Sequence, residues 1–245
     1  MAHCIDFSSD SDIDTKLRPL EVHVWKASLS QSALFLRDLI QTLSPDEKKR
    51  CEHLSDENRK RFSVGRGILR ILLGRYSGIK PHQIEFSYLA NGKPLLKENM
   101  HQDRLEFNLS HSNEIVLYVF GLGSPLGIDL EYLRPVENIE ETARRILSSR
   151  EYSYFSKLSD HEKLRAFFRF WTCKEASFKA GGRLQSLKEI ELSLHENADP
   201  SYMRGLKEYE ARYLREFEPE KGYWASLCVD KNVEHVSYMQ TLNSG

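Results

Sequence analysis

The chain has 245 residues, of which 40% are hydrophobic and 29% are charged, and its formal net charge is -1. A chain of this length can bury roughly 70–75% of its unfolded surface, so neither disulfides nor a structural metal are needed for folding. The balanced charge excludes a generally basic nucleic-acid-binding protein and a protein with a polyanionic tail.

The N-terminal half is predicted to begin with a strand and two helices. Residues 1–18 are polar and are expected to form a frayed tail, whereas residues 21–25 alternate as a strand does. A helix is expected to begin at Ser44, which is a good N-cap and heads a capping-box pattern. A longer helix is expected over residues 55–76, because apolar residues recur there at steps of three and four.

The rest of the chain changes between strand-like and helical stretches. Strands are expected at residues 84–88, 105–109, 115–120 and 126–131, with a turn at Asn91-Gly92. Helices are expected at residues 140–147, 151–158 and 161–181, before closing strands at 190–194, 223–229 and 233–239. This order favours an α+β fold with largely antiparallel sheets over repeated βαβ units. The turn-rich break at 121–125 predicts an N-terminal lobe (19–124) and a C-terminal lobe (125–245).

Two acidic residues alternate with apolar residues within the predicted strand 126–131. The period of a strand puts Asp129 and Glu131 on one face and Ile128 and Leu130 on the other. Carboxylates this close repel each other unless a cation or a proton separates them, and Mg2+ takes oxygen ligands of this kind. Taken alone, the pattern fits a half-exposed strand with two solvated acids better than a metal site.

The helix predicted at 161–181 carries a second candidate group. Trp171, Glu175 and Lys179 are four residues apart and therefore share one face of the helix. Glu175 could supply a third oxygen to a metal ion, and Lys179 could meet a phosphate. The alternative is an ordinary Glu–Lys pair that contributes about 0.2–0.5 kcal/mol to helix stability.

Ser110, His111 and Ser112 stand at the end of a predicted strand and could present two hydroxyls and an imidazole to an anion. A Ser–His nucleophile pair is less favoured, because adjacent residues rarely aim at each other and no nucleophile-elbow pattern surrounds Ser110. The alternative is a turn with a surface histidine.

Residues 46–80 carry ten Lys and Arg but only five acids, an excess of +5 that suits a ligand with several phosphates, although a solvated helix face has the same pattern. Lys93 could add a phosphate contact from a loop.

Jointly, three carboxylates, a set of cations and a histidine describe a site for a metal-bound pyrophosphate. The sequence has neither a P-loop nor a dinucleotide glycine motif, so side chains would hold the phosphates.

Five segments, in this order and spacing, carry a family resemblance: residues 61–70, 91–94, 107–112, 127–131 and 170–179. On these segments the chain resembles the Sfp-type 4′-phosphopantetheinyl transferases, and its Gly-Arg-Gly-Ile-Leu-Arg form at 65–70 is most similar to cyanobacterial members. The resemblance implies two similar α+β lobes related by a pseudo-twofold, each an antiparallel sheet packed with helices, in a monomer. It implies coenzyme A in the cleft between the lobes.

The resemblance also implies the reaction, in which 4′-phosphopantetheine passes from coenzyme A to a serine hydroxyl of an apo acyl or peptidyl carrier protein. The other product is adenosine 3′,5′-bisphosphate. The pathway that the carrier serves, whether fatty acid, polyketide or nonribosomal peptide synthesis, stays open.

Residue roles follow from the same resemblance. The implied ligands of Mg2+, or of Mn2+ in its place, are Asp129, Glu131 and Glu175. The implied catalytic residues are Glu175, Lys179 and Asp129, with Glu175 a candidate base for the carrier serine. The implied cofactor-binding residues are Arg50, Arg61, Lys93, Ser110, His111 and Lys179.

Two alternatives to this enzyme remain open. One is a module that binds coenzyme A or a carrier protein without catalysis, and the other is a coenzyme A pyrophosphatase in which water replaces the serine.

A cytoplasmic protein without membrane or nucleic-acid partners is expected. The reasons are that Met1 to Leu20 lack a secretory signal pattern, the longest apolar run is Ile115 to Phe120, and the four cysteines show no pairing pattern.

Overall fold

The structure is a computed structural model that describes residues 8–9, 16–89, 92–97, 100, 104–181, 186–192, 203–204 and 212–241. The helices are α1 (Ala33–Thr42), α2 (Pro45–Glu52), α3 (Asp56–Ser77), α4 (Ile139–Ile146), α5 (Ser149–Phe155) and α6 (Asp160–Gly181), with 3-10 turns η2 (Pro81–Gln83) and η4 (Leu187–Glu189). The strands are β1 (Ser8–Ser9), β2 (Glu21–Ser28), β3 (Phe86–Tyr88), β4 (Pro94–Leu96), β5 (Leu105–Ser112), β6 (Ile115–Leu122), β7 (Gly127–Tyr132), β8 (Glu191–Leu192), β9 (Met203–Arg204), β10 (Arg212–Phe217), β11 (Tyr223–Asp230) and β12 (His235–Gln240).

Two sheets form the centre of the molecule. The first has the strand order β1-β12-β2-β6-β5 and the second the order β10-β11-β7. Their strands pair antiparallel, except that β12 runs parallel to both of its neighbours, β2 and β1. The α+β class with mainly antiparallel sheets is thus confirmed, and the parallel pairs come from the last strand, which returns to the first sheet.

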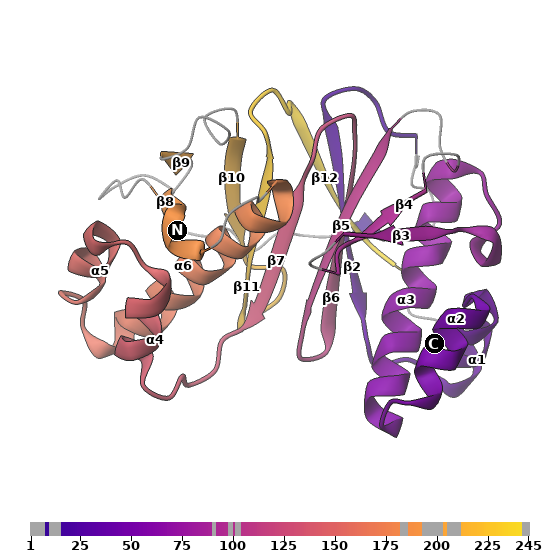
Figure 1. The fold of residues 1–245 in the computed structure, drawn as a ribbon, viewed down its shortest axis with the longest axis horizontal. Coiled ribbons are helices and arrows are strands. Elements are labelled where there is room, and N and C mark those ends of the chain that lie inside the picture. The colour runs from indigo at the N-terminus through magenta and orange to yellow at the C-terminus, as the bar shows by residue number, and fades with distance from the viewer. Residues whose placement is uncertain are drawn as a thin grey trace.

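The layers run helix, sheet, sheet, helix, with α1–α3 on one side and α4–α6 on the other (Figure 1). Val116, Tyr118 and Phe120 of β6 face the core shared with α3. The alternate residues Ile115, Leu117 and Val119 face a separate core between the two sheets. Both faces of β6 are therefore covered, which explains why this strand is an uninterrupted apolar run.

The predicted helix boundaries at the N-terminal side are confirmed. Ser44 and Glu47 form the expected capping box of α2, with Pro45 in the first turn. α3 starts after the N-cap Ser55 and ends at Gly78, whose φ of 71° is a left-handed conformation that glycine adopts without strain. None of the helices in the described ranges is both long enough and apolar enough to span a membrane.

Other elements differ from the prediction, and two predicted elements lie partly outside the residues that the structure describes. Helix α1 was not predicted, although Ser32 caps it by accepting a hydrogen bond from the Phe35 backbone. The strand predicted at 84–88 is shorter, since Ile84 closes a 3-10 turn instead. Within the predicted tail, Ser8–Ser9 pair with β12. Asn91 of the predicted turn and the end of the strand predicted at 190–194 lie outside the described residues.

Gly127, the first residue of β7, sits directly against the backbone of α6. A Cβ atom placed there would lie 2.6 Å from the Ala180 backbone nitrogen and still closer to the Ala176 carbonyl. Backbone atoms cannot move aside as a flexible side chain can, so Gly127→Ala is expected to lower the free energy of unfolding by about 3 kcal/mol. Gly65→Ala is the matched control in a urea titration, since its Cβ would make an ordinary 3.7 Å contact with Leu29. That control should be neutral or stabilising by up to about 1 kcal/mol.

Candidate functional site

Polar side chains join the two sheets where their edge strands β5 and β7 meet. Asn108 Oδ1 accepts a hydrogen bond from the Ile128 backbone nitrogen at 3.1 Å. Ser112 Oγ accepts one from the Tyr132 backbone nitrogen at 2.9 Å and donates to Glu131 Oε2 at 3.1 Å. Side chains of alternate β5 residues thus satisfy backbone groups of β7, and they fix the position of the strand that carries the acids.

The predicted alternation in β7 is confirmed. Ile128 and Leu130 lie in the core between the sheets, so Asp129 and Glu131 face the other way. Asp129 is buried at 4% exposure, and its Oδ1 receives a hydrogen bond from Ser110 Oγ at 2.9 Å. A charged group at this depth needs a partner, and α6 supplies it.

That partner is Lys179, which reaches across from α6 to β5 and β7. Its Nζ lies 2.7 Å from Asp129 Oδ1, 3.1 Å from Ser110 Oγ and 3.2 Å from the Ile128 carbonyl oxygen. These three acceptors match the three N–H donors of an ammonium group. The structure therefore brings together Asp129, Ser110 and Lys179, which are far apart in the sequence.

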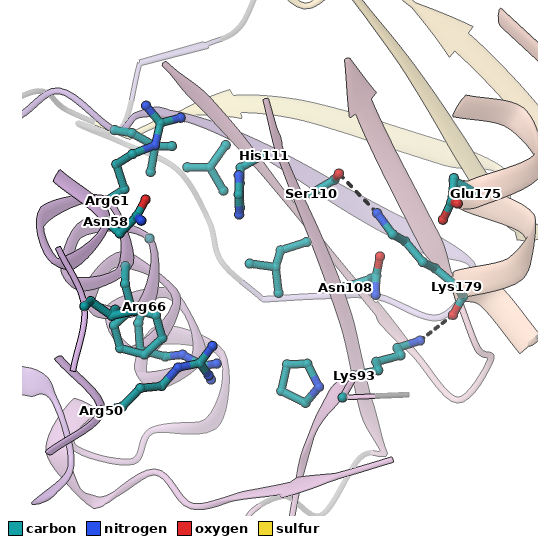
Figure 2. A pocket seen from close by; sticks show the side chains of 18 of the residues that line it. Arg50, Asn58, Arg61, Arg66, Lys93, Asn108, Ser110, His111, Glu175 and Lys179 are labelled. Atoms are coloured by element: carbon teal, nitrogen blue, oxygen red, sulfur yellow. Dashed lines mark hydrogen bonds between the residues drawn. The ribbon is translucent and has the colours of Figure 1, made fainter. Parts of the chain in front are cut away.

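A cavity of about 660 Å³ opens beside this cluster. Helices α2 and α3 line one side, and β5, the segment 92–94 and α6 line the other (Figure 2). Seven residues predicted from the sequence line it, namely Arg50, Arg61, Lys93, Ser110, His111, Glu175 and Lys179. Asp129 lies directly behind Ser110 and Lys179.

The cations that line the cavity differ in how they are held. Arg61 is paired with Glu114 Oε1 at 2.9 Å and donates to the Asn113 carbonyl, so its guanidinium is held at the β5–β6 turn. Lys93 Nζ donates to the Lys179 carbonyl oxygen at 2.6 Å, and burial lowers its pKa. Arg50 lies over the Phe62 ring, with 4.8 Å between its guanidinium carbon and the ring centre.

Burial also changes the titration of the imidazole and the carboxyl groups. Partial desolvation, together with the positive charges of Arg61 and Lys179, lowers the pKa of His111. Desolvation and the charge of Asp129 raise the pKa of both Glu131 and Glu175. The charge of Asp129 therefore disfavours ionisation of Glu131 and Glu175, and the charges of Arg61 and Lys179 disfavour protonation of His111.

The sequence did not predict the specific contacts of several residues in this region. Asn108 and Ser112 brace β7, and Arg66 lines the cavity from α3. Glu47, predicted only as a helix cap, also binds Arg70 at 2.7 Å inside the core. The period of β5 could have indicated that Asn108 and Ser112 contact β7, because they share a face with Ser110.

Comparisons with known proteins give the chain a family. Residues 125–228 match the description "4′-phosphopantetheinyl transferase superfamily", and residues 23–120 match "4′-phosphopantetheinyl transferase, N-terminal". The chain is 42% identical over 211 residues to the 4′-phosphopantetheinyl transferase HetI of Nostoc sp.. The aligned region covers 85% of this chain and 87% of HetI. The chain belongs to the 4′-phosphopantetheinyl transferase superfamily.

More distant relatives are also found. The chain is 28% identical over 145 residues to the 4′-phosphopantetheinyl transferase AcpT of Escherichia coli. The aligned region covers 59% of this chain and 69% of AcpT. The solved structure of holo-acyl-carrier-protein synthase (AcpS) of Thermotoga maritima matches at 23% identity and a TM-score of 0.36. The match covers 43% of this chain and 62% of the AcpS chain. The predictions of the family, of the enzyme class and of likeness to a cyanobacterial member are confirmed.

For a phosphopantetheinyl transferase, the question is whether the three acids fit a metal ion. As the side chains stand, no group of three or more His, Cys, Asp or Glu side chains in the described ranges is arranged to hold one. The chemistry of the acids nevertheless fits a hard cation. Asp129 Oδ2 is buried and has no hydrogen-bond partner among the residues that the structure describes. A cation there would satisfy this oxygen, and it would weaken the repulsion by Asp129 that adds to desolvation in raising the pKa of Glu131 and Glu175.

Proposed function

We propose that the chain transfers 4′-phosphopantetheine from coenzyme A to a serine hydroxyl of an apo acyl or peptidyl carrier protein, with Mg2+ or Mn2+ held by Asp129, Glu131 and Glu175. The observation that carries the proposal is the contact of Lys179 Nζ with Asp129 and Ser110 at the wall of a cation-lined cavity. Such a cavity suits an elongated ligand with several phosphates.

In the proposed step, the carrier serine oxygen attacks the phosphorus atom that bears pantetheine. The bond from this phosphorus to the leaving oxygen breaks, and adenosine 3′,5′-bisphosphate departs. The serine proton passes to a carboxylate, for which Glu175 is the candidate because it lines the cavity together with Ser110 and Lys179. When bound, the metal ion would neutralise the charge that develops on the phosphate oxygens.

The cations of the cavity hold the diphosphate in place for this attack. His111 offers an imidazole, and Lys93 adds an ammonium from the facing segment. The Ser110 hydroxyl donates to Asp129 Oδ1, so it would have to turn away from this carboxylate to donate to the phosphate. The three donors of Lys179 already have acceptors, so a direct contact with phosphate requires that Ser110 Oγ or the Ile128 carbonyl gives up its place. Positioning and charge compensation are the main sources of catalysis in phosphoryl transfer.

The decisive experiment weighs carrier proteins after the reaction. The protein is incubated with coenzyme A, Mg2+ and a panel of apo carriers, and the carriers are analysed by mass spectrometry. A gain of one phosphopantetheine that disappears with EDTA would support transfer and its metal dependence, and the panel would rank the partners. Binding of coenzyme A without any gain would favour a binding module, and release of phosphopantetheine without a carrier would favour a pyrophosphatase.

His111 is expected to take up a proton when coenzyme A binds. Its pKa is lowered in the free protein by desolvation, Arg61 and Lys179, and a bound anion would raise it again. Affinity should therefore increase as the pH falls from the pKa of the bound state to that of the free state. Calorimetry at about pH 6, in buffers with different ionisation enthalpies, measures the uptake. His111→Gln should abolish it, and equal uptake in that variant would assign the proton to another group.

We also propose that the protein is a monomer and that it acts in the cytoplasm. Cys51, Cys173 and Cys228 are free and buried, as expected for a reducing compartment. Light scattering of the purified protein would test the monomer.

A further inference from the structure

The guanidinium of Arg212, the first residue of β10, lies against the C-terminal end of α6. Its Nη1 donates to the carbonyl oxygen of Pro125, and its Nη2 lies 3.5 Å from the carbonyl oxygen of Ala180. A Cβ atom added to Gly181 would lie 3.6 Å from the same Nη2, so the guanidinium also packs on the last residue of the helix. Arg212 thus joins the last turn of α6 to the segment that leads into β7.

This end of α6 has backbone groups that need partners. The last four carbonyl groups of a helix have no hydrogen bond within the helix, and the helix dipole favours a cation beside them. Lys93 Nζ lies 2.6 Å from the Lys179 carbonyl oxygen (Figure 2) and 3.4 Å from that of Leu126. Lys93 and Arg212 therefore bind successive carbonyl groups of the same two segments, which come together only in the folded chain.

The two cations differ in their relation to the cavity. Lys93 lines it, whereas Arg212 is not among its lining residues. In the proposed function Lys93 adds an ammonium to the diphosphate, so its contact with the end of α6 would weaken when the ligand binds. Arg212 lies outside the cavity and can keep its contacts with both segments. It is therefore suited to hold the end of α6 while the ligand is bound.

Lys179 depends on this end of α6, because it is the third residue from the end of the helix. Its Nζ lies 2.7 Å from Asp129 Oδ1 and 3.1 Å from Ser110 Oγ, and these distances require that the last turn keeps its place on β7. At Gly127, β7 meets the backbone of α6 without a side chain between them. A displacement of about 1 Å at a catalytic group can reduce a rate roughly a hundredfold.

We propose that Arg212 is a positioning residue for the transfer reaction. It fixes the last turn of α6 on the segment before β7 and thereby sets the place of the Lys179 ammonium between Asp129 and Ser110. The inference rests on the proposed function, in which Lys179 and Asp129 are catalytic. A guanidinium suits this task because its fork reaches two carbonyl groups at once, which a single ammonium does not do in the same way.

Steady-state kinetics and hydrogen exchange of the Arg212→Gln protein test the assignment. The kcat of transfer is expected to fall by about ten- to a hundredfold, while calorimetry gives an affinity for coenzyme A within about threefold of the wild type. Amide protons of residues 178–181 should exchange about tenfold faster, and those of residues 164–172 should not change. Arg215→Gln is the matched control, since Arg215 is exposed on the same strand and lies over the Tyr238 ring. Its kcat and exchange should equal those of the wild type.

Four results would overturn the assignment. An unchanged kcat, or unchanged exchange at residues 178–181, would each do so. A loss of coenzyme A affinity as large as the loss of kcat would place Arg212 in contact with the ligand, and faster exchange along the whole of α6 would make its role generally structural.

A second variant covers the case in which Arg212→Gln does not fold. Arg212→Lys keeps the positive charge but loses the fork, so its kcat should still fall at least about threefold, with faster exchange at residues 178–181. An unchanged kcat in that variant contradicts the assignment. Failure of the proposed function is distinguishable, because the wild type itself would then load no carrier, whereas failure of this assignment appears only in the comparison of variant with wild type.

Discussion

Asp129→Asn is expected to reduce transfer of phosphopantetheine by roughly a thousandfold while the protein stays folded. The carboxylate accepts hydrogen bonds from Ser110 Oγ and Lys179 Nζ through one oxygen, and its other oxygen is buried without a partner in the described ranges. An amide of the same shape removes the negative charge that holds the ammonium and would attract a cation. The rate at which an apo carrier gains mass measures the effect, and urea unfolding confirms that the fold is intact.

The same loss is expected for Glu175→Gln, since Glu175 lines the cavity and is the candidate base. Asp230→Asn is the control for a change of charge alone. Asp230 ends the neighbouring strand β11, where its Oδ1 accepts a hydrogen bond from the Asn232 backbone nitrogen. Its transfer rate should equal that of the wild type. Normal turnover in both the Asp129 and the Glu175 variants would exclude these carboxylates from the reaction.

Local patterns predicted the parts of this fold that depend on neighbouring residues. The capping box at Ser44, the glycine end of α3 and the face alternation of β7 each involve a few successive positions, and each is confirmed. The same holds for the spacing that puts Glu175 and Lys179 on one face of α6, since both line the cavity. These features need no knowledge of tertiary contacts.

Long-range contacts could not be predicted in the same way. The parallel position of β12 beside β2 depends on how the whole chain returns to the first sheet. Arg61 and Arg66 are both cations of α3, yet Arg61 pairs with Glu114 at the β5–β6 turn, while Arg66 is stacked on the Phe86 ring. Charge and spacing in the sequence indicate which residue types form the site. The burial of each side chain and its partners decide which cations have N–H groups available to a ligand.

Lys174 shows the same limit most clearly, because it directly precedes Glu175 in the helix but contacts α5 and does not line the cavity. Its side chain and that of Glu151 on α5 are both 0% exposed, with 2.8 Å between Nζ and Oε2. Lys174 also donates to the carbonyl oxygens of Leu187 and Ile190, and Glu151 accepts from the Leu192 backbone nitrogen at 2.8 Å. Burial lowers the pKa of Lys174, and the charge of Glu151 opposes this effect. The pair therefore ties α5, α6 and β8 together.

Lys174→Met is consequently expected to lower the free energy of unfolding by about 3–5 kcal/mol, because it leaves the Glu151 carboxylate buried without its counter-ion. A urea titration measures the loss, with Arg145→Met as the control. Arg145 pairs with Glu141 on the surface of α4, so its removal should change stability by less than about 1 kcal/mol. The double variant Glu151→Leu/Lys174→Met should recover part of the loss, since an apolar pair leaves no unpaired charge in the core. A single variant as stable as the wild type would mean that the carboxylate takes up a proton or finds water at little cost, and that the tie between α5 and α6 comes from apolar packing instead.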